Sequence, residues 1–457
     1  GRSARVRWME VQRRVLSALM FFPRGGSSHV ARALADALPD YGWDVTVLAG
    51  SLPSRHSDAE AFYDGLDVVP VDFSAGDAPM HPSYEDRPGA ADRCFALVDD
   101  EAYEEHVAAW SAALERADAA GADVLHLHHL TPLHEAAARV APDVPVVGHL
   151  HGTELLMLEQ IARGAPAHWT YADAWARRMR RWAQGSRRLL LPTGALVERA
   201  VALLGVSPSA CAVASNGFDP ELFQPQPVDR AAFWHRQLVD EPRGWRPGED
   251  AGSIAYTATE VSRLMTGPIA LAVGRFTAVK RLGLLVRAFA RADVPGASLV
   301  LIGGHPGEWE GEHPYDAVQA TGAEGVFLAG WHDHDALAGF LNAGDLLALS
   351  SVREQFGLVL VEGMACGLPA VAVDRLGPAE IVEDGRTGWL VPPDDEAALA
   401  RVLREALTDE RERERRGERA QAEAVSRWAW PAVAGAVAGV LDEAAGAGAG
   451  LALGENR

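Results

Sequence analysis

Residues 15–49 read VLSALMFFPRGGSSHVARALADALPDYGWDVTVLA and have the pattern of a strand–helix–strand unit. Residues 15–22 form a continuous apolar run, which is typical of a strand buried on both faces. After Pro23-Arg24-Gly25-Gly26, apolar residues at four-residue spacing predict a helix, and residues 45–49 predict the next strand. Strands joined in this way lie parallel in one sheet, and such sheets bind ligands at the carboxyl ends of their strands.

The same alternation continues along the chain and is interrupted once. Residues 123–128, 144–149 and 187–192 predict further strands, whereas residues 224–266 are rich in Pro, Trp and Arg and show no periodicity. The alternation then restarts, with predicted strands at 269–273, 298–303, 326–329, 345–350 and 369–373 and helices at 282–292, 336–343, 357–366 and 396–407.

The chain is therefore predicted to be an α/β protein with two doubly wound, Rossmann-like domains. The first covers residues 9–222 and the second residues 268–427, with an inter-domain insertion at 223–267. A cleft between the domains is the expected ligand site. A dense run of mixed charge at residues 408–423 predicts a solvated helix face.

Composition excludes several classes of partner. The 457 residues carry 42 Lys+Arg against 63 Asp+Glu, a net charge of −21, which argues against nucleic acid and anionic membrane surfaces. Three isolated cysteines without metal or redox spacing are expected to be reduced thiols in a cytoplasmic protein. No charge-free apolar run reaches about 18 residues, so no transmembrane segment is predicted. Met9 is a candidate native start, so the origin of residues 1–8 stays open. The sequence also leaves the oligomeric state open.

One compositional feature points to a specific residue. Of the 42 basic residues, 41 are Arg, and Lys280 is the single Lys. We attribute this bias to a GC-rich genome that exchanges Lys for Arg wherever either serves. A lysine that remains is expected where a guanidinium cannot replace a compact ammonium. The alternative is a surface lysine that survived by chance.

Two segments after predicted strands carry the chemistry expected of a diphosphate site. Arg275 and Lys280 follow the strand at 269–273, where two cations could neutralise a diphosphate leaving group. A Walker A loop is excluded, because Gly274 and Lys280 are six residues apart and Arg281 replaces the Ser or Thr. The alternative is a pair of surface cations whose stems lie on apolar groups.

The second segment, residues 351–358, ends in a helix that is predicted to begin near Phe356. Its first amides have no intrahelical partner and favour an anionic phosphate. Glu354 precedes this helix and Glu362 lies eight positions later, about 80° away around a helix axis. Both carboxylates could therefore accept hydrogen bonds from sugar or ribose hydroxyl groups. The alternative is a pair of solvated surface glutamates.

Two turns of the first half are weaker candidates. Gly25 and Gly26 would let a ligand approach the backbone, although no GxGxxG motif is present, which counts against a dehydrogenase. His151 is expected to project from the carboxyl edge of the first sheet. Four further histidines lie nearby, but no carboxylate or Cys completes a recognisable ligand set, so a metal site is not predicted. They are His126, His128, His129 and His134.

Together these motifs resemble the retaining glycosyltransferases of family four, which have the GT-B fold and belong to the glycogen-synthase-like superfamily. The resemblance covers most of the chain and rests on the order and spacing of its motifs. They are Gly25-Gly26, His151-Gly152, Ser215-Asn216-Gly217-Phe218-Asp219, the segment 274–280, Glu354-x7-Glu362 and the stretch 385–391. It implies transfer of a hexosyl group from a nucleotide diphosphate sugar, with UDP favoured, to a small-molecule or glycan acceptor.

The resemblance also implies roles for single residues. His151, Arg275, Lys280 and Glu354 would be catalytic: the two cations assist departure of the diphosphate, Glu354 contacts the donor sugar and His151 lies by its 6-position. The implied donor-binding set is Gly25, Gly26, Arg275, Lys280, Trp331, His332, Glu354, Phe356, Gly357, Leu358 and Glu362. Neither a metal nor another cofactor is expected. A final helix at 428–445 would cross back onto the first domain.

Two features depart from the family pattern, and other functions stay open. The insertion at 224–266 is long, and residues 77–105 hold nine Asp/Glu against two Arg. That acidic stretch would suit a cationic acceptor, with a plain solvated surface as the alternative. The competing functions are a GT-B-fold epimerase, for which acid–base carboxylates cannot be placed, a phosphorylase, and a catalytically silent nucleotide-sugar binder that regulates a pathway.

Overall fold

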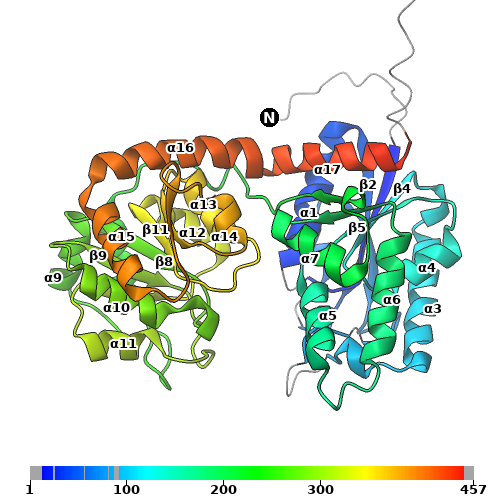
Figure 1. Cartoon of the computed structure of the whole chain (residues 1–457), viewed down its shortest axis with the longest axis horizontal. Coiled ribbons are helices and arrows are strands. Elements are labelled where there is room, and N and C mark those ends of the chain that lie inside the picture. Colours follow the sequence, from blue (N-terminus) through cyan, green and yellow to red (C-terminus); the bar gives the residue numbers. More distant parts are fainter. Residues whose placement is uncertain (1–12, 24–25, 56, 81, 87–91, 447–457) are drawn as a thin grey trace, which may run out of the picture. The chain divides into compact units, whose positions relative to one another are not determined.

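The computed structural model describes residues 13–23, 26–55, 57–80, 82–86 and 92–446 and divides the chain into two compact units (Figure 1). The first unit consists of Gly1–Ser215 and Trp430–Arg457, and the second of Asn216–Ala429. Each unit has its own parallel sheet covered by helices on both faces. The predicted α/β class with two doubly wound domains is therefore confirmed.

The first unit contains a seven-stranded parallel sheet in the order β3-β2-β1-β4-β5-β6-β7. Its strands are β1 (Arg13–Leu19), β2 (Trp43–Ser51), β3 (Asp67–Asp72), β4 (Val124–His128), β5 (Val146–His149), β6 (Arg188–Leu191) and β7 (Cys211–Val213). Its helices are α1 (Gly26–Ala37), α2 (Ala59–Phe62), α3 (Asp100–Arg116), α4 (Leu133–Val140), α5 (Thr153–Gly164), α6 (Ala172–Gly185), α7 (Gly194–Leu204) and α17 (Trp430–Ala444).

Alternate residues of β1 explain why helices cover both faces of this sheet. Leu16 and Ala18 belong to one apolar cluster with residues of α3, α4 and α6. Val15 and Leu19 point to the opposite face and belong to a cluster with residues of α1 and α17. Because both faces are covered, the strand reads as a continuous apolar run rather than an alternating one.

The second unit contains a six-stranded parallel sheet in the order β10-β9-β8-β11-β12-β13. Its strands are β8 (Ile269–Val273), β9 (Ser298–Ile302), β10 (Val326–Gly330), β11 (Leu346–Leu349), β12 (Ala370–Val373) and β13 (Gly388–Val391). Its helices are α8 (Arg230–His235), α9 (Ala258–Val261), α10 (Leu282–Ala292), α11 (Pro314–Thr321), α12 (Leu337–Asn342), α13 (Leu358–Ala365), α14 (Gly377–Ile381), α15 (Glu396–Thr408) and α16 (Glu410–Trp428).

The segment that was predicted to be an inter-domain insertion is part of the core of the second unit. Trp234 and Trp245 are both fully buried. Trp234 packs on Phe340 of α12, with ring centroids 5.8 Å apart. Trp245 stacks on Phe276 and donates an indole hydrogen bond of 2.9 Å to the carbonyl of Gly304. The sequence pattern missed this because irregular segments can bury aromatic residues without any periodicity.

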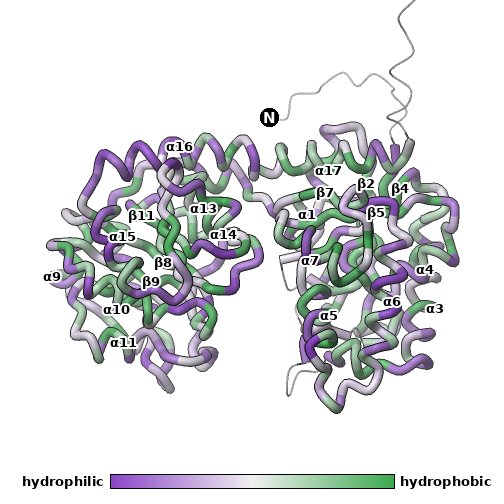
Figure 2. The backbone as a smooth tube through the Cα atoms, in the orientation of Figure 1, coloured by the Kyte–Doolittle hydropathy of each residue, from purple (hydrophilic) through white to green (hydrophobic). Residues whose placement is uncertain are grey.

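Helix α16 also differs from its prediction as a solvated face. Figure 2 shows that it is largely hydrophilic, yet Arg413 and Arg416 are buried. The Arg416 guanidinium donates 2.6 Å to the carbonyl of Gly388 and lies 3.9 Å from the ring centroid of Trp389. One side of the helix therefore packs on the edge strand β13, because arginine stems and guanidinium planes can cover apolar surface.

Several smaller differences concern strands. The strands β3 and β7 were not predicted, and β13 was read only as part of a motif. Strand β1 ends at Leu19, although the buried apolar run continues to Phe22. Helix α17, by contrast, belongs to the first unit and packs against α1, as expected of the final helix at 428–445. Boundaries shift in this way because the apolar run reports burial, whereas a strand is defined by pairing.

Candidate active site

Each sheet has a point where the strand order reverses, and there the loops after two neighbouring strands diverge. In the second unit this point lies between β8 and β11, and in the first unit between β1 and β4. Ligands of doubly wound sheets bind at the carboxyl ends of the strands at such points. The segments after β8, β11, β1 and β4 are therefore the places to look for function.

In the second unit, the segments after β8 and β11 are joined by hydrogen bonds. The amide of Val352 donates 3.0 Å to the carbonyl of Val279. The hydroxyl of Ser350 donates 2.7 Å to the carbonyl of Lys280. The topology thus brings together two segments that are about 70 residues apart in the sequence, which the order of a parallel sheet predicts.

The two segments bring Lys280 and Glu354 into direct contact. The Lys280 ammonium lies 2.5 Å from Oε2 of Glu354, and each side chain is 21% exposed. Gly274 (φ +155) borders the lysine stem, since a Cβ at this position would lie 3.3 Å from Cε of Lys280. The positive φ and the close lysine both favour glycine. Arg275 is exposed, and the described residues give it no ion pair.

Helix α13 begins directly after Glu354 and offers free amides. Gly357 (φ +101) is its N-cap and provides no side-chain cap, so Leu358 and the residue after it keep unpaired N–H groups. Phe356 is buried, and its carbonyl closely approaches Gly377 of α14. The helix start is therefore held in place and can accept an anionic phosphate.

The helical spacing argument for the two glutamates is wrong in one respect. Glu354 lies in the turn before α13, so no helical angle relates it to Glu362. Glu362 lies within α13, is 2% exposed and accepts a 2.6 Å hydrogen bond from Nε2 of His334. The bond to Glu362 raises the pKa of the half-exposed His334 above its usual value.

His334 is a site residue that the sequence analysis missed. It follows β10 by four residues, two positions after His332, so the closely spaced histidines next to the expected base site were the available signal. Trp331 is 45% exposed. His332 is buried, its Nε2 lies 3.1 Å from the carbonyl of Ala329, and burial lowers its pKa. An exposed indole beside a rigid turn could receive a nucleotide base.

In the first unit, the candidate residues follow β1 and β5. Gly25 lies outside the described residues. Gly26 is the first residue of α1, and no atom lies within 4 Å of the position that a Cβ would take there. His151 follows β5 and is half-buried, and its amide donates 2.9 Å to Oε1 of Glu154. Nε2 of His151 lies 3.0 Å from Nδ1 of His128.

Glu154 is a second residue that the sequence analysis missed as a contributor to this site. It is fully buried on α5, and its Oε2 lies 3.4 Å from Nδ1 of His129. Burial alone would raise the pKa of Glu154. The charge of His129 and its hydrogen bonds outweigh burial and lower it. Glu154 thus holds the backbone at His151 from within the unit.

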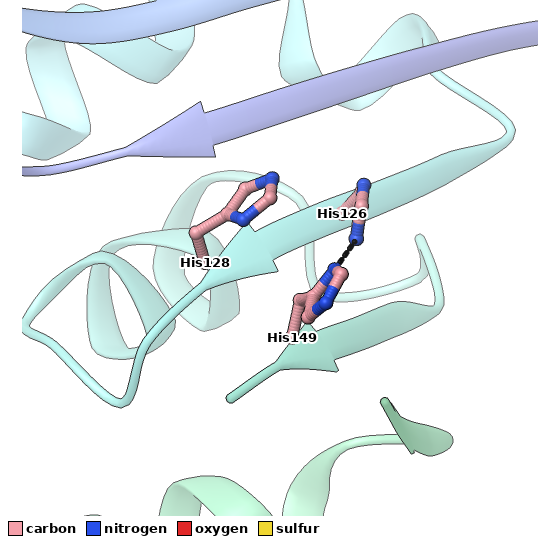
Figure 3. Close-up of side chains that lie close together, drawn as sticks. All are labelled: His126, His128 and His149. Atoms are coloured by element: carbon pink, nitrogen blue, oxygen red, sulfur yellow. Dashed lines mark hydrogen bonds between the residues drawn. The ribbon is translucent and has the colours of Figure 1, made fainter. Parts of the chain in front are cut away.

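The structure brings three buried histidines together, contrary to the expectation that they only follow one another along a strand. Ring nitrogens of His126, His128 and His149 all lie within 4.8 Å of one another, and none of the three side chains is exposed (Figure 3). Nε2 of His126 lies 3.1 Å from Nδ1 of His149. Burial lowers the pKa of His126 to about 4. His134 lies outside this group and packs on Trp182.

Several carboxylates of the acidic stretch 77–105 have partners inside the first unit. Asp86 accepts hydrogen bonds from Trp169 and His168, which lower its pKa. Asp99 caps α3, and Asp100 pairs with Arg178. Arg178 thus offsets the charge of Asp100, and the bonds to Asp86 and Asp99 engage these carboxylates within the first unit.

Two family models match successive parts of the chain. The model described as Glycosyltransferase Family 4 matches residues 24–222, and the model described as Glycosyl transferases group 1 matches residues 259–423. Together they cover most of the sequence. The chain belongs to glycosyltransferase family 4. The predicted family is therefore confirmed, and this protein is a glycosyltransferase.

Two kinds of relative of this glycosyltransferase are matched along about nine-tenths of their length. Glycogen synthase of Mycobacterium tuberculosis is 27% identical over 440 residues, which cover 91% of this chain and 90% of the relative. N-acetyl-alpha-D-glucosaminyl L-malate synthase of Bacillus anthracis is 24% identical over 410 residues, 87% of this chain and 88% of the relative.

The fold of the glycosyltransferase is also found among solved structures. The Anabaena protein Alr3699/HepE, solved in complex with UDP, superimposes with a TM-score of 0.66 over 94% of this chain and 100% of its own, at 18% identity. The predicted GT-B fold is therefore confirmed. Among the described helices of this glycosyltransferase, none has both the length and the apolar character needed to cross a bilayer.

Proposed function

We propose that the protein is a retaining glycosyltransferase that moves a hexosyl group from a nucleotide diphosphate sugar, with UDP as the favoured nucleotide, to a small-molecule or glycan acceptor. The observation that carries the proposal is the contact of 2.5 Å between Lys280 and Glu354 beside the uncapped start of α13. This arrangement combines positive charge for a diphosphate with a carboxylate for hydroxyl groups. The solved UDP complex of Alr3699/HepE supports the choice of nucleotide.

In this proposal the second unit binds the donor. Arg275, Lys280 and the first amides of α13 hold the diphosphate, and Glu354 accepts hydrogen bonds from hydroxyl groups of the sugar. Glu362 accepts hydrogen bonds from the ribose, while Trp331 and the buried His332 lie at the base. The positive charge needed by the diphosphate comes from Arg275 and Lys280, so the proposed transfer needs no metal ion.

The reaction breaks the bond between the anomeric carbon and the diphosphate oxygen and forms a bond to an acceptor hydroxyl on the same face. The electron pair of the broken bond stays with the diphosphate, whose growing charge Lys280 and Arg275 stabilise. The acceptor proton passes to an oxygen of the leaving phosphate. His151 contacts the transferring sugar, and Glu154 keeps its backbone in position through the bond of 2.9 Å.

The test is to incubate the purified protein with UDP- and GDP-hexoses, without acceptor and then with candidate acceptors, and to measure nucleotide release. Slow hydrolysis with one nucleotide, faster release with an acceptor and a product of unchanged anomeric configuration by NMR would support the proposal. The variant Glu354→Gln should lose at least tenfold in turnover. Glu324→Gln, at a residue whose side chain is 89% exposed in the same unit, is the matched control.

Other outcomes would favour the competing functions. Tight binding of a nucleotide sugar without turnover would indicate a silent binder. Interconversion of two nucleotide sugars would indicate an epimerase. A product of inverted configuration would overturn the retaining mechanism and leave the donor site in place.

A further inference from the structure

Strand pairing places three histidines on one face of the first sheet. His128 of β4 pairs directly with His149 of β5, and His126 lies two residues before His128. Side chains of directly paired residues, and of residues two apart, point to the same face. The three rings therefore converge at the carboxyl ends of β4 and β5, on the face that α1 and α17 cover.

We propose that His126, His128 and His149 bind one divalent ion of the zinc class. Nε2 of His126 and Nδ1 of His149 are 3.1 Å apart, close to the distance of about 3.3 Å between two ligands of a tetrahedral zinc ion with Zn–N bonds of about 2.0–2.1 Å. The third nitrogen lies within 4.8 Å of these two, so it would move closer by up to about 1.5 Å when the three share one ion. Figure 3 shows the rings of His126 and His149 facing each other, with His128 at the end of the strand that carries His126.

Hydrogen bonds within the protein leave this cluster incomplete. Nδ1 of His126 and Nε2 of His149 are buried and have no hydrogen-bond partner among the described residues. Buried polar atoms are normally paired, because an unpaired one loses its bonds to water without replacement. His128 is better satisfied, since it lies 3.3 Å from the hydroxyl of Ser17 and 3.0 Å from His151. An ion bound to Nε2 of His126 and Nδ1 of His149 would replace the hydrogen bond between these two atoms and leave the opposite nitrogen of each ring without a partner among the described residues.

The ligand type and the surrounding charge indicate the class of ion. Three imidazoles without a carboxylate favour Zn²⁺, Co²⁺, Ni²⁺ or Cu²⁺ over Mg²⁺ or Ca²⁺, which prefer oxygen ligands. The buried carboxylate of Glu154 contacts His129, whose ring centroid lies 4.5 Å from that of His151. The His151 ring in turn stacks on His149 at 4.8 Å. The carboxylate of Glu154 is thus separated from His149 by the rings of His129 and His151, and its negative charge would offset part of the charge of the ion.

His151, which contacts the cluster, reaches solvent, because it is half-buried while the three proposed ligands are not exposed. An ion would therefore enter past His151, and a water molecule could complete its coordination there. The ion would hold β4 and β5 together beneath His151 and takes no part in the sugar transfer proposed above. The site and the donor site thus fail or succeed independently.

The experiment measures metal binding rather than activity. The full-length protein is stripped with a chelator, dialysed and titrated with Co²⁺, then with Zn²⁺ as competitor, and bound zinc is counted by mass spectrometry. We expect one ion per chain, a visible Co²⁺ absorption band that Zn²⁺ abolishes, and an increase in Tm on adding Zn²⁺. His126→Gln and His149→Gln should each weaken binding at least tenfold.

The matched control is His134→Gln, at a buried histidine of the same unit whose two ring nitrogens have no partner and which lies outside the cluster. It should bind Co²⁺ as the wild type does. Fewer than about 0.2 ions per wild-type chain at saturating Zn²⁺ would overturn the proposal, even if the variants fail to fold. Equal loss of binding in His134→Gln and the cluster variants would also overturn it.

Discussion

Replacing Lys280 with arginine should reduce kcat by about 7- to 45-fold, although the charge is conserved. The ammonium lies 2.5 Å from Glu354, and the lysine stem runs close to Gly274, which leaves little room for a broader guanidinium. Moving the cation from about 4 Å to about 5.5 Å from one phosphate charge costs about 1 kcal/mol at an effective dielectric constant of about 20. One to two such charges on the leaving group correspond to roughly 7- to 45-fold in rate.

The assay is steady-state release of nucleotide from the donor that the wild type turns over fastest, with Tm measured for every variant. Arg411→Lys, at an exposed position of α16, makes the reverse exchange away from the site and should leave kcat unchanged. Lys280→Gln sets the rate without the cation. If Lys280→Arg kept kcat within about threefold of the wild type while Lys280→Gln lost activity, the charge alone would suffice and the geometric argument would be refuted.

Three further predictions follow from contacts in the second unit. Glu362→Gln should raise donor KM more than it lowers kcat, and a pure kcat effect would contradict a role in ribose binding. Glu362 raises the pKa of His334 in the folded state above its unfolded value of about 6.5. The stabilisation from this pair is therefore fully present below about pH 6.5 and is lost as the pH rises through the pKa of His334 in the folded state. His334→Asn should remove this pH dependence from the free energy of unfolding measured in urea. Trp245→Ala should lower the free energy of unfolding by about 3–5 kcal/mol, because the indole is fully buried. The control Trp309→Ala, at a residue that is 39% exposed, should lower it by less than about 1 kcal/mol. Equal losses would contradict the packing argument.

The meeting of the segments after β8 and β11 was predictable because it depends on local sequence patterns and one topological rule. The strands β8 and β11 are short apolar runs, and Lys280 and Glu354 lie a few residues beyond their ends. In a parallel doubly wound sheet all carboxyl ends meet at one edge, so residues after neighbouring strands come together whatever their separation in the sequence. The ion pair between them is the consequence.

Parts of the core and of the candidate site depend on contacts that no local pattern encodes. Trp245 lies in a segment without periodicity, and its burial against Phe276 depends on where that segment packs. The bond between His334 and Glu362 joins a loop to a helix 28 residues later. The turn position of Glu354 was predicted correctly, but the angle of about 80° between the two glutamates does not apply, since the glycine N-cap at Gly357 starts α13 after Glu354.

Periodicity in the amino-acid sequence was thus sufficient for the two doubly wound sheets, and the spacing of motifs was sufficient for the family. Neither periodicity nor motif spacing could show that His126, His128 and His149 converge, because this requires the register between β4 and β5 and the burial of both strand ends. Register and burial arise when segments distant in the sequence compete for the same core, and pair energies there depend on every neighbour. The histidine cluster therefore became visible in the folded chain, while the lysine of the proposed donor site already stood out in the composition.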